Sequence, residues 1–216
     1  MGKYISRLLL IVLVSASASF ADPIVSGVTF QTTPLTNMTT GVANPTSINI
    51  LFQEFTGTLS GNLAVDATDA GTYPPGSTGS FQIASGTAVA TYFLHTDPPN
   101  TTTTRFQGSA TFDTAILGVE VLGGTLAQGD GIVGLASVTY NADGNRGFEL
   151  GSPADLQDTF TISADGHTVS WDATSDSAVD DMRIVTAGAV STVSEPGSLV
   201  LLGTGLLSGI GMLRRR

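Results

Sequence analysis

The chain has 216 residues, of which 41% are hydrophobic and none is cysteine, so disulfides, thiol nucleophiles and thiolate metal sites are excluded. Between Asp22 and Glu195, three arginines stand against all 18 acidic residues, which gives this stretch a formal charge of −15. Such a composition predicts a strongly acidic surface, which repels phosphate backbones and excludes nucleic acid as a partner, and which attracts cations such as calcium.

The first segment, residues 1–21, predicts a signal peptide. Two basic residues precede an apolar run, Leu8–Val14, and small residues follow it. Seven apolar residues are too few to cross a bilayer about 30 Å thick, so a retained membrane anchor is disfavoured. Cleavage after Ala21 fits best, and Ala16 and Ala18 offer a second site. The expected partners are the Sec machinery and signal peptidase.

Residues 22–190 predict a single all-β domain, an antiparallel β-sandwich of jelly-roll type. The stretch is rich in Thr, Ser, Gly, Val and Ile, with frequent turn-forming residues and no amphipathic helical pattern. A β-solenoid is the competing architecture, but it needs a fixed repeat that the sequence lacks. The clearest unit is a hairpin over 158–172, in which Asp165-Gly166 forms the tight turn. Its apolar face is expected to hold Phe160, Ile162, Val169 and Trp171.

Other segments alternate between apolar and polar residues and are bounded by turn formers such as Tyr73–Gly76, Asp97–Asn100, Gln128–Gly131 and Asn141–Asn145. The further strands are expected at Val25–Gln31, Ser47–Leu59, Gly79–Leu94, Thr103–Phe112, Gly131–Tyr140 and Asp181–Thr186.

His95 and His167 are the only histidines of the sequence and therefore the only candidates for a histidine general base. His167 follows the hairpin turn and is interpreted as an exposed turn residue. His95 ends an apolar strand beside Asp97 and a proline-stiffened loop, so these two residues are candidates for binding a ligand, although a hydrogen-bonded structural histidine is the simpler interpretation. No nucleophile elbow, phosphate-binding loop or zinc-protease motif is present, and we expect no enzymatic activity and no catalytic residue.

Calcium is the one cofactor that the sequence suggests, because hard cations bind carboxylate and carbonyl oxygens of acidic loops. The candidate ligands are Asp176, Asp180 and Asp181 in one loop, or Asp97 with Glu149 if the fold brings them together. No twelve-residue calcium loop is present, and the alternative is a solvated acidic face with no bound metal.

Three aromatic residues are candidate stacking platforms for sugar rings. Trp171 alternates in phase with Val169, which favours a place in the core, whereas Tyr73 lies beside two prolines and is expected to be exposed. Tyr92 is the third candidate. A carbohydrate-binding module is therefore the alternative function, and a polysaccharide-acting hydrolase is a third.

The last segment combines three features in order. A short linker, 191–195, leads to Glu195-Pro196, and the 17 uncharged residues 197–213 would span about 25 Å as a helix. Arg214, Arg215 and Arg216 close the chain, and the positive-inside rule places them in the cytoplasm with the body outside.

Residues 193–216 resemble the PEP-CTERM sorting signal, a tail that is also classed as an ice-binding protein C-terminal anchor. The resemblance implies recognition by an exosortase-type membrane peptidase in a bacterium that makes extracellular polysaccharide. Typical members have proline where this chain has Ser194. The body also looks like that of other PEP-CTERM proteins of unknown activity, through Leu94-His95-x-Asp97-Pro98, Gly108-Ser-x-Thr-Phe-Asp113, Ile116-Leu-Gly-Val119 and Arg146-Gly-Phe-Glu149.

Together these features predict a non-enzymatic surface or extracellular-matrix protein. It would be exported, held in the inner membrane by its tail with the body outside the cytoplasm, and then processed to the cell surface or the extracellular space.

Overall fold

The computed structural model describes residues 21–39, 47–74, 76–99, 102–150, 158–175 and 178–188. The chain divides into one compact unit, Phe20–Ala189, and a second made of its two ends, which lies outside these ranges. The predicted linker, sorting motif Glu195-Pro196, membrane segment and arginines 214–216 therefore lie outside the described residues, as do the signal peptide before Ala21 and Asp176. Within the described ranges, no helix is both long and apolar enough to cross a membrane.

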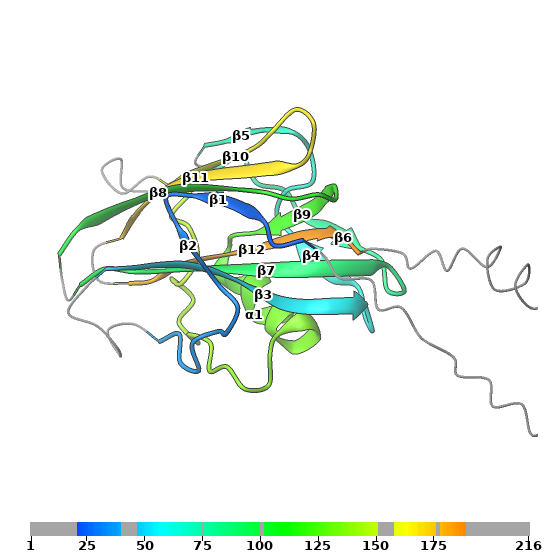
Figure 1. Cartoon of the computed structure of the whole chain (residues 1–216), viewed down its shortest axis with the longest axis horizontal. Coiled ribbons are helices and arrows are strands. Elements are labelled where there is room, and N and C mark those ends of the chain that lie inside the picture. Colours follow the sequence, from blue (N-terminus) through cyan, green and yellow to red (C-terminus); the bar gives the residue numbers. More distant parts are fainter. Residues whose placement is uncertain are drawn as a thin grey trace, which may run out of the picture. The chain divides into compact units, whose positions relative to one another are not determined.

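Two five-stranded sheets lie one above the other in a sandwich-like arrangement (Figure 1). The first sheet has the order β1 (Ile24–Ser26), β8 (Thr104–Thr111), β11 (Thr168–Ser175), β10 (Thr159–Ile162), β5 (Gly71–Tyr73). The second has the order β2 (Thr29–Gln31), β3 (Ile48–Thr58), β7 (Ala88–Asp97), β12 (Asp180–Ala187), β9 (Ile116–Glu120). A small third sheet pairs β4 (Leu63–Val65) with β6 (Phe81–Ile83), and the helix α1 spans Gly123–Val133.

The predicted hairpin is confirmed as β10 and β11. Phe160 pairs with Trp171 across the two strands, and Gly166 adopts a φ of 69° in the turn between them. Trp171 is only 3% exposed, as its alternation with Val169 predicts. The prediction of β-structure is therefore confirmed for this hairpin, whose apolar and polar residues alternate regularly.

The main hydrophobic core fills the space between the two sheets. Phe160 and Trp171 reach it from the first sheet, and Leu94, Met182 and Ile184 reach it from the second. The outer face of the second sheet is also covered. Figure 1 shows α1 beneath this sheet, and a second buried cluster there joins Met38, Ile48, Ile50, Phe52, Phe93, Leu126 and Val138. Both faces of the second sheet are therefore buried.

The prediction of a strand at Gly131–Tyr140 is wrong, because its first residues belong to α1. Four glycines weaken the helical pattern, and no side chain of the helix caps its N-terminus. That role falls to Asp66, whose carboxylate accepts hydrogen bonds from the N–H groups of Val121 and Leu122 at 2.8 and 2.9 Å. A negative charge at this end favours the helix dipole.

Three further expectations need correction. The predicted strand Val25–Gln31 is split into β1 and β2 at Gly27, which has a φ of 71° and leaves no room for a Cβ beside the carbonyl oxygen of Gln107. Strand β2 then pairs in parallel with β3, so the sheets are not purely antiparallel. The predicted strand Gly79–Leu94 is likewise interrupted between β6 and β7.

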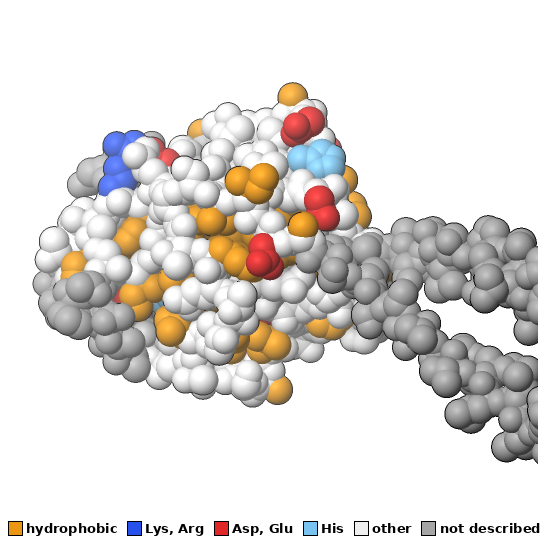
Figure 2. All heavy atoms as spheres, in the orientation of Figure 1, with side chains coloured by type: hydrophobic (Ala, Val, Ile, Leu, Met, Phe, Trp, Pro, Cys, Tyr) orange, Lys and Arg blue, Asp and Glu red, His pale blue; other side chains and the backbone are white. Residues whose placement is uncertain are grey.

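The expectation that the acidic residues form a strongly acidic surface is only partly met. Figure 2 shows one face of the domain, on which acidic side chains are few among uncharged polar and hydrophobic ones. Among the described residues, seven acidic side chains are instead buried: Glu54, Asp66, Asp97, Glu120, Asp158, Asp180 and Asp181. These seven acidic side chains therefore add little to the charge of the surface.

Candidate functional site

Three carboxylates meet at one end of the main core. Glu149, Asp158 and Asp180 each place a carboxylate oxygen within 4.8 Å of the others. Asp158 and Asp180 are fully buried, and Glu149 is half-buried. We call these three residues the carboxylate cluster.

Strand alternation explains why the two aspartates point inward. Asp158 lies just before β10, in phase with Phe160, and Asp180 is the first residue of β12, in phase with Met182. Each aspartate thus continues the core-facing row of its own sheet, one in the first sheet and one in the second. Glu149 comes from a segment beside β12, where the N–H of Asp181 donates to the carbonyl of Arg146 at 2.7 Å.

The hydrogen bonds of the two aspartates differ. One oxygen of Asp158 accepts from the N–H of Thr174 at 2.8 Å, and the other accepts from the N–H of Glu149 at 2.7 Å. Neither oxygen of Asp180 accepts a hydrogen bond from an N–H or hydroxyl group of the described residues, and the side chain that Asp180 can interact with, Glu149, is itself an acid. A buried ionised carboxylate without a partner is costly, so Asp180 needs a proton or a cation.

The pKa values of the three carboxyl groups reflect their burial and the lack of hydrogen-bond donors to Asp180. Burial, followed by repulsion from Asp158, Glu149 and Asp181, raises the pKa of Asp180 to about 10. Burial and the neighbouring Asp158 raise the pKa of Glu149 to about 7. Burial also raises the pKa of Asp158. Without a cation, Asp180 therefore holds a proton near neutral pH, and Glu149 can share it.

A second buried group of charges lies on the outer face of the second sheet. Arg183 is unexposed and donates to Glu54, Glu120 and Asp130. Arg146, also buried, forms an ion pair with the same Asp130 at 2.8 Å. The two arginines balance two of the three acids, and the raised pKa of Glu120, about 8, lets the third hold a proton near neutral pH. We call these five residues the arginine network.

The arginine network depends on a glycine of α1. A Cβ on Gly129 would lie 2.1 Å from Nη1 of Arg183 and 2.4 Å from a carboxylate oxygen of Glu120. Only a residue without a side chain lets the helix approach these charges so closely.

The structure places His95 inside the domain. Its Nδ1 lies 2.7 Å from a carboxylate oxygen of Asp181, and the histidine is 1% exposed. Asp97, two residues further along β7, is 5% exposed. His167 is part-buried, and its Nδ1 lies 3.1 Å from the carbonyl of Phe112. The roles of His95 and Asp97 in ligand binding stay predictions. The expectation that His167 is an exposed turn residue is met only in part, because the residue is half-buried.

The predicted calcium ligands are only partly brought together. Asp180 belongs to the carboxylate cluster, but Asp181 alternates to the other face of β12 and pairs with His95. Asp176 lies outside the described residues. Glu149 does enter the cluster, but with Asp158 and Asp180 rather than with Asp97.

Tyr73 is half-buried rather than freely exposed. Its ring stacks on that of Phe160, with centroids 4.7 Å apart, and its hydroxyl donates to the carbonyl of Asp69 at 2.8 Å. One face of the ring is thus used in packing. Tyr92 is 2% exposed, which removes it as a surface platform for sugars.

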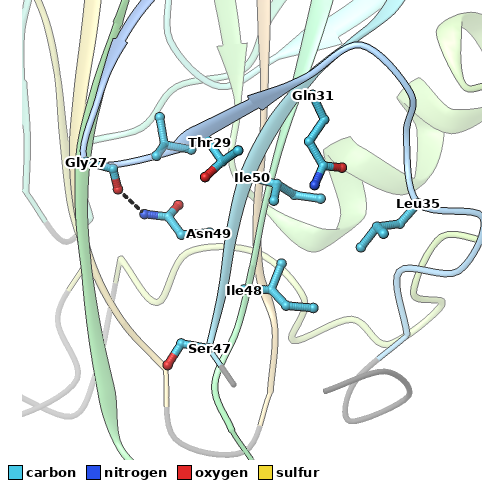
Figure 3. A pocket seen from close by; sticks show the side chains of 9 residues that line it. Gly27, Thr29, Gln31, Leu35, Ser47, Ile48, Asn49 and Ile50 are labelled. Atoms are coloured by element: carbon cyan, nitrogen blue, oxygen red, sulfur yellow. Dashed lines mark hydrogen bonds between the residues drawn. The ribbon is translucent and has the colours of Figure 1, made fainter. Parts of the chain in front are cut away.

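An open hollow of about 590 Å³ lies beside β2 and β3. Figure 3 shows Gln31, Leu35, Ile48 and Ile50 around it. Asn49, which also lines it, donates to the carbonyl of Gly27 at 2.6 Å. None of the residues that line it is titratable or aromatic. The described residues around the hollow therefore supply no acid or base for catalysis and no aromatic ring for stacking on a ligand.

Comparison with known proteins gives no relative: no family model matches the chain, and no curated protein or solved structure is significantly similar to it.

Sequence reasoning missed Asp158 and the arginine network. Strand alternation carried a signal for Asp158, because an aspartate in phase with Phe160 and Ile162 must either face the core or end the strand. No comparable signal joins Glu54, Asp130 and Arg183, since these residues come from β3, α1 and β12.

Proposed function

We propose that the chain is an exported surface or extracellular-matrix protein with a non-enzymatic β-sandwich body. The body would cross the inner membrane through the Sec machinery, be held there by the C-terminal segment, and be released or attached outside after exosortase-type processing. The observation that carries this proposal is the ordered tail, in which Glu195-Pro196, an uncharged stretch and three arginines follow one another.

The extent of the compact unit supports this division of the chain. It spans Phe20–Ala189, which agrees within two residues with the predicted body, 22–190. Removal of both ends would then leave the packed sheets complete, as a processed protein requires.

The burial of His95, Arg146 and Arg183 supports a non-enzymatic role. His95 is nearly unexposed and bonded to Asp181, and Arg146 and Arg183 are buried in ion pairs. A general base must reach a proton of its substrate, which a side chain enclosed in this way does not do in the described conformation.

We further propose the jelly-roll arrangement for the two sheets. Its support is that the chain passes from one sheet to the other between β7 and β8, β8 and β9, β9 and β10, and β11 and β12.

Processing of the tail tests the proposal. In an exosortase-bearing bacterium, replacing Glu195 and Pro196 with alanine should leave an unprocessed, membrane-retained protein. The matched control replaces Ser191 and Thr192 of the linker with alanine and should be processed normally. Ser194→Pro, which restores the usual motif, should be processed at least as well as the native chain. Unchanged release of the Glu195/Pro196 variant would refute exosortase recognition.

A further inference from the structure

We propose that the carboxylate cluster of Glu149, Asp158 and Asp180 is a calcium site that joins the two sheets at one end of the core. The inference concerns the folded body alone and does not depend on export or tail processing.

The first argument is the convergence of donors. Oxygens of the three carboxylates lie within 4.8 Å of one another. Calcium binds oxygens at about 2.3–2.6 Å, so ligands on opposite sides of the ion are about 4.6–5.2 Å apart. An ion between the three side chains can therefore contact all of them after small side-chain movements.

The second argument is that the cluster lacks a compensating charge. Asp180 is fully buried, and neither of its oxygens accepts a hydrogen bond from a donor group of the described residues. From Asp22 to Glu195 the sequence contains no lysine, and its arginines are already paired: Arg105 with Asp172, Arg146 with Asp130, and Arg183 with Glu54, Glu120 and Asp130. A bound cation would supply the missing positive charge.

The chemistry of the donors favours calcium. The site offers carboxylates and no histidine or cysteine, which suits a hard cation rather than zinc or copper. Magnesium usually keeps several waters and takes one or two carboxylates, whereas calcium accepts a larger and less regular set of oxygens. Three converging carboxylates therefore match calcium better.

A pocket beside Glu149 would serve as the entry path. Glu149 lines an open pocket of about 370 Å³ together with Asn145, Phe148 and Leu150. Water in this pocket can complete the coordination sphere from the exposed side, while Asp158 and Asp180 bind from the buried side. Asp158 is already oriented by the N–H groups of Thr174 and Glu149.

The bound ion would connect elements that are distant in sequence. Asp158 precedes β10 of the first sheet, Asp180 begins β12 of the second, and Glu149 lies on the segment beside β12. We expect calcium to stabilise the contact between the sheets by binding the folded state and not the unfolded chain.

The test uses the full chain in mild detergent after metal removal with EDTA, titrated with calcium chloride at pH 7.5 by calorimetry and by thermal unfolding. We expect saturation by one ion per chain below about 1 mM, and a rise of the unfolding midpoint of about 5 °C at saturation. Absence of saturable binding, or an equal midpoint in EDTA and in calcium, would overturn the proposal. Magnesium binding as tight as calcium would overturn the choice of metal.

Substitutions of the proposed ligands test whether the ion binds at the carboxylate cluster. Asp180→Asn should weaken calcium binding at least about tenfold, yet its unfolding midpoint in EDTA should equal or exceed that of the native chain, because one of three crowded acids is gone. The half-buried Glu149→Gln gives the same test if Asp180→Asn does not fold. Asp165→Asn changes an exposed acid of the hairpin turn and should bind calcium normally. Native affinity in Asp180→Asn or Glu149→Gln would contradict the site.

Discussion

Arg183 donates two hydrogen bonds to Glu54, from Nε at 2.5 Å and from Nη2 at 2.9 Å, and neither side chain is exposed to solvent. The pair joins β12 to β3 across the intervening strand β7. A guanidinium in contact with both carboxylate oxygens is a bidentate arrangement, which lysine cannot reproduce.

Arg183→Met should therefore destabilise the domain by about 3–5 kcal/mol, because it leaves Glu54 buried without its counter-ion. Urea unfolding at pH 7 measures the change. Arg105→Met removes an arginine from the exposed ion pair with Asp172 and should change the free energy of unfolding little. Equal effects of the two substitutions would show that burial of the arginine network is unimportant.

Gly129 and Gly131 offer a matched pair in α1. Gly129→Ala should destabilise the domain by about 1–3 kcal/mol, because its Cβ would clash with Arg183 and Glu120. Gly131→Ala has open space around the new Cβ and should stabilise the helix by up to about 1 kcal/mol. The comparison uses thermal and urea unfolding, and a neutral Gly129→Ala would contradict the close approach of the helix.

The stability of the domain should fall as pH rises from about 5 to 9. Burial raises the pKa of Glu120 to about 8, against the opposing effect of Arg183 and with smaller contributions from Glu54 and Asp66. The folded state then binds the proton more tightly than the unfolded chain. The stabilisation is complete below the unfolded pKa of about 4.5 and is lost as pH rises through 8.

Glu120→Gln should reduce this slope by up to about 1.4 kcal/mol per pH unit, which is the contribution of one proton. Glu149 and Asp180 of the carboxylate cluster, whose pKa values are also raised, should account for the slope that remains. Unfolding in urea with EDTA present, at pH 5 to 9, gives the measurement. Asp165→Asn is the control, because its pKa is lowered and it titrates below this range. A slope as steep in Glu120→Gln as in the native chain would show that Glu120 does not contribute to it.

Tyr73 tests the carbohydrate-binding alternative. We expect no saturable binding of the native protein on a glycan array. Saturable binding that disappears in Tyr73→Ala and is kept in Tyr73→Phe would contradict the purely structural role and identify the ring as a sugar platform. Both variants need a check by circular dichroism, because the ring also packs on Phe160.

Local sequence patterns predicted the elements that are stabilised by residues close to one another in the sequence. The β10–β11 hairpin follows from alternation and a turn glycine, and Trp171 lies in the core as its phase predicts. Helix α1 could not be predicted in this way, because its N-terminal partner Asp66 lies 56 positions before Leu122. Tertiary contacts outweigh the weak helix propensity of its glycines.

The candidate site was predictable only in part for the same reason. Asp180 was among the expected calcium ligands, but its partners, Glu149 and Asp158, come from other segments that the sheets bring together. The excess of acidic residues was visible in the sequence. Which acidic residues lie on the surface, in the arginine network or in the carboxylate cluster depends on the register of β7 and β12. No short sequence motif encodes that register.

Intact-mass analysis of the protein from fractionated bacteria, in its native host, tests the proposed function most directly. The predicted product begins at Asp22, lacks Arg214–Arg216, and is found at the cell surface or in the medium. A cytoplasmic protein that keeps residues 1–21 and the terminal arginines would contradict export and processing.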